Sequence, residues 1–177
     1  MSDLPSLDDI DGVYLSGYAL LDFRSRDAVL AMVKKIKASG KPIFFDPTTT
    51  GALKVVSLEE ALSWVSMMDG NLLNSEEAHY LGNSKDLAEA EENLKKYTPL
   101  VVIKLGSKGA MAVNGNESAK VPAVTTNVVD TTGAGDSFAA GFIPKWLETN
   151  DLTQALTAGA SLAAKCVSSV GARPPLN

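Results

Sequence analysis

The chain has little of what builds disulfides and transition-metal sites, because it contains one cysteine, Cys166, and one histidine, His79. A single cysteine excludes an intrachain disulfide and a cysteine-based zinc site. A single histidine excludes a histidine-cluster metal site and argues against a Ser-His-Asp catalytic triad. Cys166 lies in an apolar run with helical spacing, which favours a buried structural thiol over a reactive one.

Long apolar runs and an excess of basic charge are also missing. No apolar stretch reaches the roughly 20 residues that a membrane-spanning helix needs, and the polar, acidic residues 1–5 do not resemble a signal peptide. We therefore expect a cytoplasmic protein. The formal net charge of -5 offers no basic surface for nucleic acid or acidic lipid. A phosphate site would have to be built locally, from backbone groups and a few cations.

What is present is an alternation of short apolar runs with segments of helical periodicity. This order predicts an α/β domain with a three-layer, doubly wound and mostly parallel sheet, helices on both faces, and residues 1–177 forming a single domain. Asn114-Gly115 is a typical hairpin turn between two further short strands at 109–113 and 118–122. The expected buried strands span 12–17, 42–47, 71–74 and 99–105, and the expected helices span 24–39, 58–65, 75–81 and 87–97, with one ending near 149 and one at 151–169.

The most informative segment is residues 128–138, which reads VVDTTGAGDSF. Two β-branched residues indicate the end of a strand, and the Gly-Ala-Gly turn leads into an apolar-periodic helix. A helix start carries unpaired N–H groups and the positive end of the helix dipole, so it suits an anion. Asp136 would repel a bound phosphate but fits a base that takes a proton from an attacking hydroxyl. The alternative is an ordinary helix start with an aspartate in its first turn.

Two further segments could carry chemistry. In the first, Asn74 and Glu77 follow a strand and open a helix; they could hold hydrated Mg²⁺, or they could simply cap the helix. The second is the turn at 104–109, KLGSKG, whose glycines let the backbone bend tightly and approach a ligand. Lys104 could meet phosphate or be a solvated lysine at a strand end. Because ligands bind beyond the carboxyl ends of strands, one crevice could gather four predicted strand-end residues: Asp46, Asn74, Lys104 and Asp130.

Residues 130–138 match every fixed position of Asp-Thr-x-Gly-Ala-Gly-Asp-x-Phe, and the segment resembles the signature of the ribokinase-like (PfkB-type) carbohydrate kinases. The resemblance implies a ribokinase-like fold and an ATP- and Mg²⁺-dependent phosphotransferase that phosphorylates a hydroxyl of a sugar or nucleoside. It implies Asp136 as the catalytic base, with Gly133, Ala134 and Gly135 as the anion hole.

The same resemblance assigns roles to the other candidates. Asn74 and Glu77 match the family's Asn-x-x-Glu motif, which organises magnesium, through water at Glu77, and the nucleotide phosphates. Lys104, Gly106 and Gly109 match a turn beside the nucleotide. The family's Asp-Pro-Asn reads Asp46-Pro47-Thr48 here, which leaves Asp46 without a clear role. Asp130 and Thr132, together with the Gly-Ala turn near residue 171, resemble the positions that hold a monovalent cation such as K⁺.

The resemblance covers only the later part of the family pattern. Residues 1–60 do not supply the sugar-binding Gly-Gly region, the N-terminal strands or the small β lid. We therefore expect an uncovered sheet edge and self-association into a homo-oligomer. Two functions stay open, a kinase and a non-catalytic nucleotide-binding or assembly module. An NAD-binding oxidoreductase domain is a poor third interpretation, because Phe138 stands where the dinucleotide fingerprint needs its third glycine.

Overall fold

The structure is a computed structural model that describes residues 6–174. The chain divides into two compact units, Met1–Val101 and Val102–Asn177. The strands form a mixed sheet in which hydrogen-bonded neighbours follow chain order from β1 to β6. The division between the units falls inside β4 (Leu100–Lys104). None of the described helices has the length and the apolar composition needed to cross a membrane.

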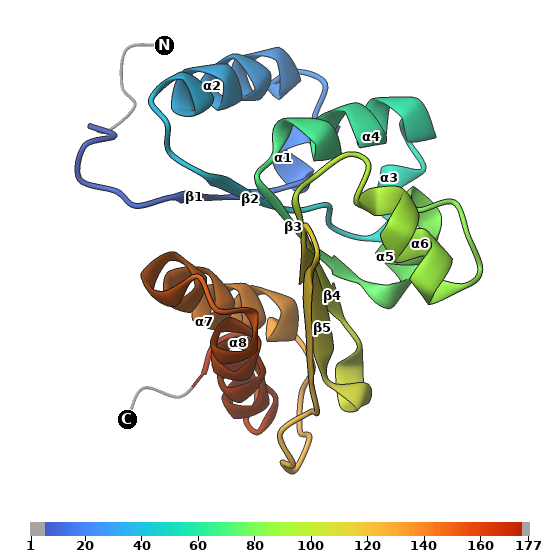
Figure 1. Ribbon diagram of the computed structural model, residues 1–177, viewed down its shortest axis with the longest axis vertical. Coiled ribbons are helices and arrows are strands. Elements are labelled where there is room, and N and C mark those ends of the chain that lie inside the picture. Colours follow the sequence, from blue (N-terminus) through green and yellow to red (C-terminus); the bar gives the residue numbers. More distant parts are fainter. Residues whose placement is uncertain (1–5, 175–177) are drawn as a thin grey trace. The chain divides into compact units, whose positions relative to one another are not determined.

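The first unit holds three parallel strands, β1 paired with β2 and β2 with β3. The side chains of residues 43–45 and 71–73 are almost completely buried, as expected for parallel strands that are covered on both faces. Its elements, shown in Figure 1, are β1 (Val13–Ser16), α1 (Tyr18–Leu21), α2 (Arg26–Ala38), β2 (Ile43–Asp46), α3 (Thr50–Leu53), α4 (Leu58–Met67), β3 (Gly70–Asn74), α5 (Ser75–Leu81) and α6 (Leu87–Leu94).

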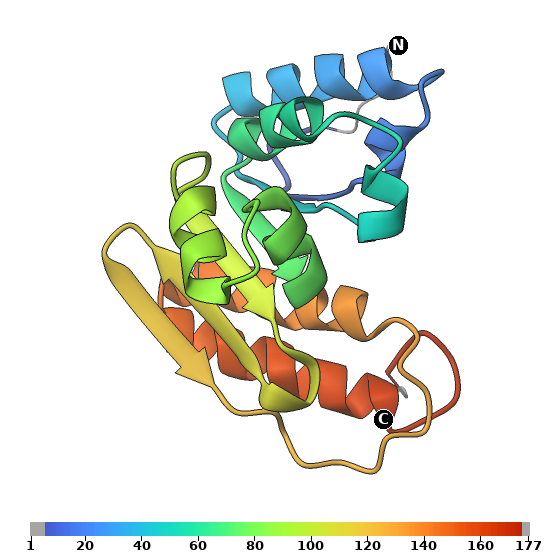
Figure 2. The same cartoon turned by 90° about the vertical axis from the view of Figure 1, so that its right-hand side faces the viewer.

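The second unit combines an antiparallel hairpin with two long helices. After the end of β4 it contains the 3-10 turn η1 (Gly106–Lys108), β5 (Ala110–Asn114), β6 (Glu117–Val121), α7 (Ala134–Thr149) and α8 (Leu152–Val167). The helices α7 and α8 lie side by side, and α8 packs against the hairpin (Figures 1 and 2). The aromatic rings of Phe138, Phe142 and Trp146 stack along α7.

Most of the predicted elements are confirmed, and the errors concern short or loop segments. The helices α1 and α3 were not predicted, because four residues carry no readable helical period. The Ser57 side chain caps α4 by accepting from the Glu60 amide, but the Glu60 carboxylate does not complete a capping box. It accepts from Arg26 Nη1 at 2.7 Å instead. An ion pair between α2 and α4 thus takes the place of the hydrogen bond that a capping box would form between the Glu60 carboxylate and the Ser57 amide.

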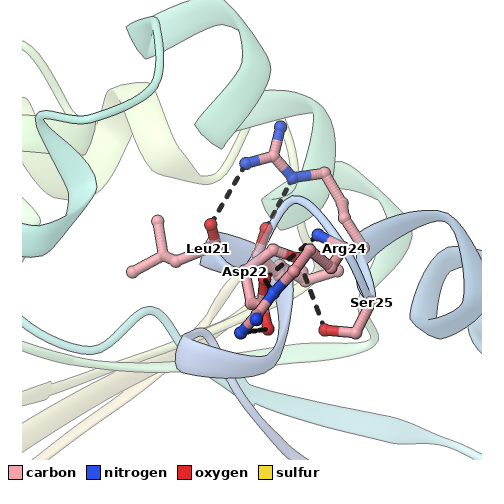
Figure 3. A network of polar contacts seen from close by, with 6 residues as sticks. Leu21, Asp22, Arg24 and Ser25 are labelled. Atoms are coloured by element: carbon pink, nitrogen blue, oxygen red, sulfur yellow. Dashed lines mark hydrogen bonds and ion pairs between the residues drawn. The ribbon is translucent and has the colours of Figure 1, made fainter.

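The turn between α1 and α2 is held by a dense set of polar contacts (Figure 3). The Asp22 carboxylate accepts from the amide, Nε and Nη2 of Arg24, at 3.0, 3.0 and 3.1 Å. Arg26 donates to the carbonyl oxygen of Leu20 at 2.6 Å and lies over the Trp64 ring of α4. The guanidinium of Arg26 therefore caps α1 and ties it to α4 at the same time.

Candidate active site

The start of α7 is built on a left-handed glycine. Gly133 is the N-cap residue with φ of 76°, and no side chain caps the helix there. A Cβ on Gly133 would lie 2.2 Å from the carbonyl oxygen of Ala172, so only glycine fits. The N-caps of α3, α4, α5, α6 and α8 each carry a side-chain cap. An uncapped start leaves the positive end of a 16-residue helix available to an anion.

The amide groups of this turn are not equivalent. Ala134 donates its amide to the carbonyl oxygen of Thr131 at 3.2 Å. Among the residues that the structure describes, no backbone carbonyl accepts the amides of Gly133 and Gly135. Of the three amides of the Gly-Ala-Gly turn, the middle one therefore has a partner inside the turn, and the anion hole stays a prediction.

Lys104 lies beside the same turn. A Cβ placed on Gly135 would be 3.4 Å from Lys104 Nζ, so the ammonium group reaches the start of α7 from the end of β4. Lys104 is half-buried, which strengthens its field relative to a fully solvated lysine. The structure thus places the ammonium group near the start of α7, and the phosphate contact of Lys104 stays a prediction. Asp136 is exposed in the first turn of the same helix.

The turn after β4 contains two glycines with positive φ, one packed closely against other residues and one with open space around it. Gly109 has φ of 95°, and a Cβ there would lie 2.0 Å from the carbonyl oxygen of Val121. Gly109 therefore lets the turn approach β6. Gly106 also has positive φ, 59°, but nothing lies within 4 Å of its would-be Cβ. Gly106 is exposed, so it suits an approach to a ligand, whereas Gly109 is needed for packing.

Asp130 ties the loop before α7 to the chain end after α8. Its Oδ1 accepts from the Thr132 amide at 2.9 Å, and its Oδ2 accepts from the Gly171 amide at 3.1 Å. Cys166, which is fully buried as predicted, donates from Sγ to the carbonyl oxygen of Thr132 at 3.5 Å. Figure 2 shows the two loop segments running together. The residues expected around a monovalent cation, Asp130, Thr132 and the Gly171 turn, are thus brought together.

Val128 and Val129 do not end a strand, contrary to the sequence-based prediction. Residues 122–131 form a loop, and the two valine side chains are 60% and 51% exposed. The loop is fixed instead by the amides of Val129 and Asp130, which both donate to the carbonyl oxygen of Val167 at 2.7 and 3.2 Å. Asp130 therefore stands in a loop and not at a strand end, because the end of α8 supplies the partner that a neighbouring strand would have supplied.

Asp130 predicts a defined pH dependence of stability. Hydrogen bonds from the amide and hydroxyl of Thr132, and then from the Gly171 amide, hold the pKa of Asp130 below its ordinary value of 3.8. A carboxyl whose pKa is lowered by folding stabilises the protein above its unfolded pKa, and this contribution disappears as the pH falls through the folded value. We expect Asp130→Asn to lower the melting temperature at neutral pH, with the difference from the parent shrinking below pH 3.8.

Thermal unfolding followed by circular dichroism over that pH range would check this expectation. An NMR titration of the Asp130 carboxyl supplies the matching direct measurement. A melting-temperature difference that stays constant across the whole range would contradict the assigned hydrogen bonds, because an uncharged structural effect does not titrate.

Asn74 and Glu77, in the first unit, form a complete capping box at the start of α5. The Asn74 side chain accepts from the Glu77 amide at 2.9 Å, the Glu77 Oε2 accepts from the Asn74 amide at 2.8 Å, and Asn74 Nδ2 donates to Glu77 Oε1. Glu77 is 2% exposed. The helix cap and the family motif are therefore the same set of atoms, and the two interpretations of these residues do not exclude each other.

Asp46 ends β2 as predicted, and its Oδ1 accepts from the Thr48 amide at 3.0 Å. Thr48 has φ of 80° and is 6% exposed. A β-branched residue is an outlier in this region, where asparagine is enriched. Thr48 thus occupies a left-handed position that asparagine, the third residue of the family's Asp-Pro-Asn order, would tolerate better.

The structure brings together Lys104, Gly133, Gly135 and Asp136 in the second unit, with Asp130 and Thr132 at the adjoining loop. Asn74, Glu77 and Asp46 belong to the first unit. Within residues 6–174, no three histidine, cysteine, aspartate or glutamate side chains cluster in a way that could hold a metal ion. The only sign in the sequence of the contact between Asp130 and Gly171 is the weak match of the Gly-Ala turn near residue 171 to the family's cation site.

Comparisons with known proteins identify sequences and folds to which this chain is similar. An uncharacterized sugar kinase of Archaeoglobus fulgidus is 38% identical over 105 residues, which cover 59% of this chain and 42% of that protein. The crystal structure of adenosine kinase from Sinorhizobium meliloti has a TM-score of 0.86 at 28% identity, covering 93% of this chain and 51% of that one. A Vibrio cholerae fructokinase with bound fructose, ADP and calcium has a TM-score of 0.84 at 25% identity, covering 97% and 59%.

The chain thus spans about half the length of these proteins, and the fold that it shares with them is ribokinase-like. The model of the pfkB family of carbohydrate kinases matches residues 2–177. The signature at 130–138, the Asn-x-x-Glu capping box and the structural likeness all point the same way, and the chain belongs to the pfkB family of carbohydrate kinases.

Proposed function

We propose that this chain carries the phosphoryl-transfer machinery of an ATP-dependent kinase that phosphorylates a hydroxyl group of a sugar or a nucleoside. The observation that carries the proposal is the uncapped start of α7, where left-handed Gly133, the Lys104 ammonium and exposed Asp136 meet. A cationic, amide-rich turn suits phosphate. An acid beside that turn fits a base that accepts a proton, although an aspartate in the first turn also stabilises a helix.

In the proposed reaction, Asp136 accepts the proton of the acceptor hydroxyl as its oxygen attacks the γ-phosphorus of ATP. A bond forms between that oxygen and phosphorus, the bond from phosphorus to the bridging oxygen breaks, and ADP leaves with the bond's electron pair. The amides of Gly133 and Gly135, with Lys104, stabilise the negative charge on the transferred group. This is catalysis by positioning and electrostatics, as is usual for phosphoryl transfer.

Magnesium and a monovalent cation fit the residues that are present. Mg²⁺, which neutralises nucleotide phosphate charge when bound, keeps several waters and needs few protein oxygens. The Glu77 carboxylate is buried and accepts from Asn74, so we assign it to orienting Asn74 and to contact with metal through water only. Asp130 and the Thr132 carbonyl group supply hard oxygen ligands suited to K⁺.

A second candidate function is a non-catalytic nucleotide-binding or assembly module. The observation that favours it is length, since the chain spans about half of each relative described above. Such a module would keep the anion site at α7 and contribute no turnover. Both candidate functions predict nucleotide binding, but only the kinase predicts phosphoryl transfer.

Calorimetric titration and a transfer assay on the 177-residue chain separate the two. We expect ATP with Mg²⁺ to bind, and we expect Lys104→Met to weaken that binding, because it removes the ammonium beside Gly135 and keeps an unbranched side chain. Lys108→Met is the matched control, since Lys108 is exposed in the same turn. Release of ADP with fructose, ribose or adenosine as acceptor supports the kinase. Binding without release supports the module, and absence of binding contradicts both.

A further inference from the structure

The turn after β2 contains two buried hydroxyl groups that form no hydrogen bond. Thr48 lies two residues beyond the end of β2 and is 6% exposed. Within residues 6–174, the Oγ1 atoms of Thr48 and Thr50 are both buried and have no hydrogen-bond partner. A buried hydroxyl without a hydrogen bond keeps the full cost of its desolvation. Native proteins contain few such groups, and here two of them stand two residues apart in one turn.

The backbone of the same turn is strained. Thr48 has φ of 80°, and a β-branched side chain is sterically unfavourable in this left-handed region. The Thr48 amide donates to Asp46 Oδ1 at 3.0 Å, which holds the conformation in place. Residues kept in sparsely populated conformations are concentrated at sites that bind ligands or switch. Because strain and unpaired hydroxyl groups coincide, a ligand that relieves both would be bound favourably.

The sheet places this turn where ligands of parallel sheets bind. Ser16, the last residue of β1, pairs with Asp46 in parallel register, so the two strands end side by side. The Gly17 amide donates to the Asp46 carbonyl oxygen at 2.7 Å. A Cβ on Gly17 would lie 2.5 Å from the carbonyl oxygen of Pro47, so the two chain segments touch through backbone. Ligands of open α/β sheets bind beyond the carboxyl ends of the strands.

Charge and hydrogen-bonding capacity indicate the kind of ligand. Between Lys41 and Lys54, the only charged residue of the sequence is Asp46. A carboxylate at the start of the turn repels a phosphate. Each threonine hydroxyl can both donate and accept a hydrogen bond, and the hydroxyl groups of a sugar or of a ribose have the same capacity. The turn therefore suits a neutral ligand that is rich in hydroxyl groups.

We propose that the hydroxyl groups of Thr48 and Thr50 bind hydroxyl groups of the acceptor and contribute to acceptor specificity. Both Oγ1 atoms are buried in the described conformation, so the turn opens before the acceptor reaches them. Leaving the left-handed conformation releases the strain at Thr48, which offsets part of the cost of opening. An acceptor that bonds only to the open turn shifts the turn toward that state. The identity of the ligand rests on the proposed kinase function.

Calorimetric titration of the 177-residue chain with fructose, ribose and adenosine tests the proposal without requiring turnover. Thr48→Val and Thr50→Val keep the branched shape and remove the hydroxyl. Each should raise the dissociation constant of the bound acceptor about 3- to 10-fold, the effect of one lost hydrogen bond. Each should also raise the stability of the free chain in chemical denaturation, because an unpaired buried hydroxyl is gone. Thr48→Ser keeps the hydroxyl and should keep the acceptor affinity of the parent.

Thr49→Val is the matched control in the same turn. Thr49 is exposed, and its side chain caps α3 by accepting from the Ala52 amide at 3.3 Å. Its loss should lower stability and leave acceptor affinity unchanged. An internal water bridging the two hydroxyl groups is the competing explanation. In that case Thr48→Val and Thr50→Val would lower stability without weakening acceptor binding, which would overturn the proposal.

The remaining outcomes separate this proposal from the kinase function. Failure of the parent chain to bind any of the three acceptors overturns the acceptor site. Acceptor binding that Thr48→Val and Thr50→Val weaken, without ADP release in the transfer assay, supports the acceptor site and contradicts the kinase function of this chain. Transfer to an acceptor whose affinity both valine variants leave unchanged supports the kinase and contradicts the acceptor site.

Discussion

Replacing Asp136 with asparagine should lower the rate of phosphoryl transfer about 10²- to 10⁴-fold. Asp136 is exposed in the first turn of α7, and an amide of the same shape cannot accept the proton of an attacking hydroxyl. ATP binding should persist or tighten, because the substitution removes a negative charge beside an anion site. Release of ADP in the presence of a sugar or nucleoside acceptor measures the rate, and calorimetric titration measures the affinity.

Asp27→Asn is the matched control for this experiment. Asp27 is likewise an exposed aspartate in the first turn of a helix, α2, and it has no place in the proposed chemistry. The control should keep both the rate and the affinity of the parent chain. If Asp136→Asn turns over as fast as the parent, the aspartate is not the base, and the purpose assigned to an acid beside the anion site is lost.

Gly133→Ala should destabilise the second unit and remove ATP binding together. Alanine in the left-handed conformation costs roughly 1–2 kcal/mol by itself. The new Cβ would also lie 2.2 Å from the Ala172 carbonyl oxygen, so the loop before α7 or the turn after α8 has to move. We expect the free energy of unfolding to fall by more than about 2 kcal/mol, as measured by chemical denaturation.

Gly115→Ala distinguishes the backbone contribution to the loss of stability from the contribution of the steric clash with Ala172. Gly115 lies in the hairpin turn with φ of 60°, and nothing would lie within 4 Å of a Cβ there. This variant should lose only the backbone contribution and should keep ATP binding. Equal losses of stability in the two variants would mean that the close approach of Ala172 does not constrain Gly133, and that the α7 start tolerates a side chain.

The parts of this structure that the sequence predicts are those set by neighbours along the chain. The buried strands at 43–46 and 100–104 follow from unbroken apolar runs. The cap of α8 follows from Asp151, whose side chain accepts from the Gln154 amide three residues on. The start of α7 is equally local, since a glycine turn, an acid and an apolar helix stand within eleven residues. A short motif with a physical reason for every position is readable without coordinates.

The parts that could not be predicted depend on contacts between distant residues. Asp130 and Gly171 are 41 positions apart and meet through one hydrogen bond. The loop at 122–131 carries β-branched valines typical of a strand, yet Val167 of α8 takes the hydrogen bonds that would have joined a sheet. Periodicity cannot reveal such partners. The position of Lys104 beside Gly135 likewise depends on a contact between residues that are far apart in the sequence.

The capping box at the start of α5 has a consequence for ligand recognition. Both Glu77 oxygens accept from Asn74, and the Glu77 side chain has almost no exposed surface. Asn74 is therefore locked in one rotamer before any ligand arrives, and its amide has little conformational entropy left to lose on binding. In the proposed function, the hydrogen bonds that begin this seven-residue helix would also preorganise Asn74 for contact with the nucleotide.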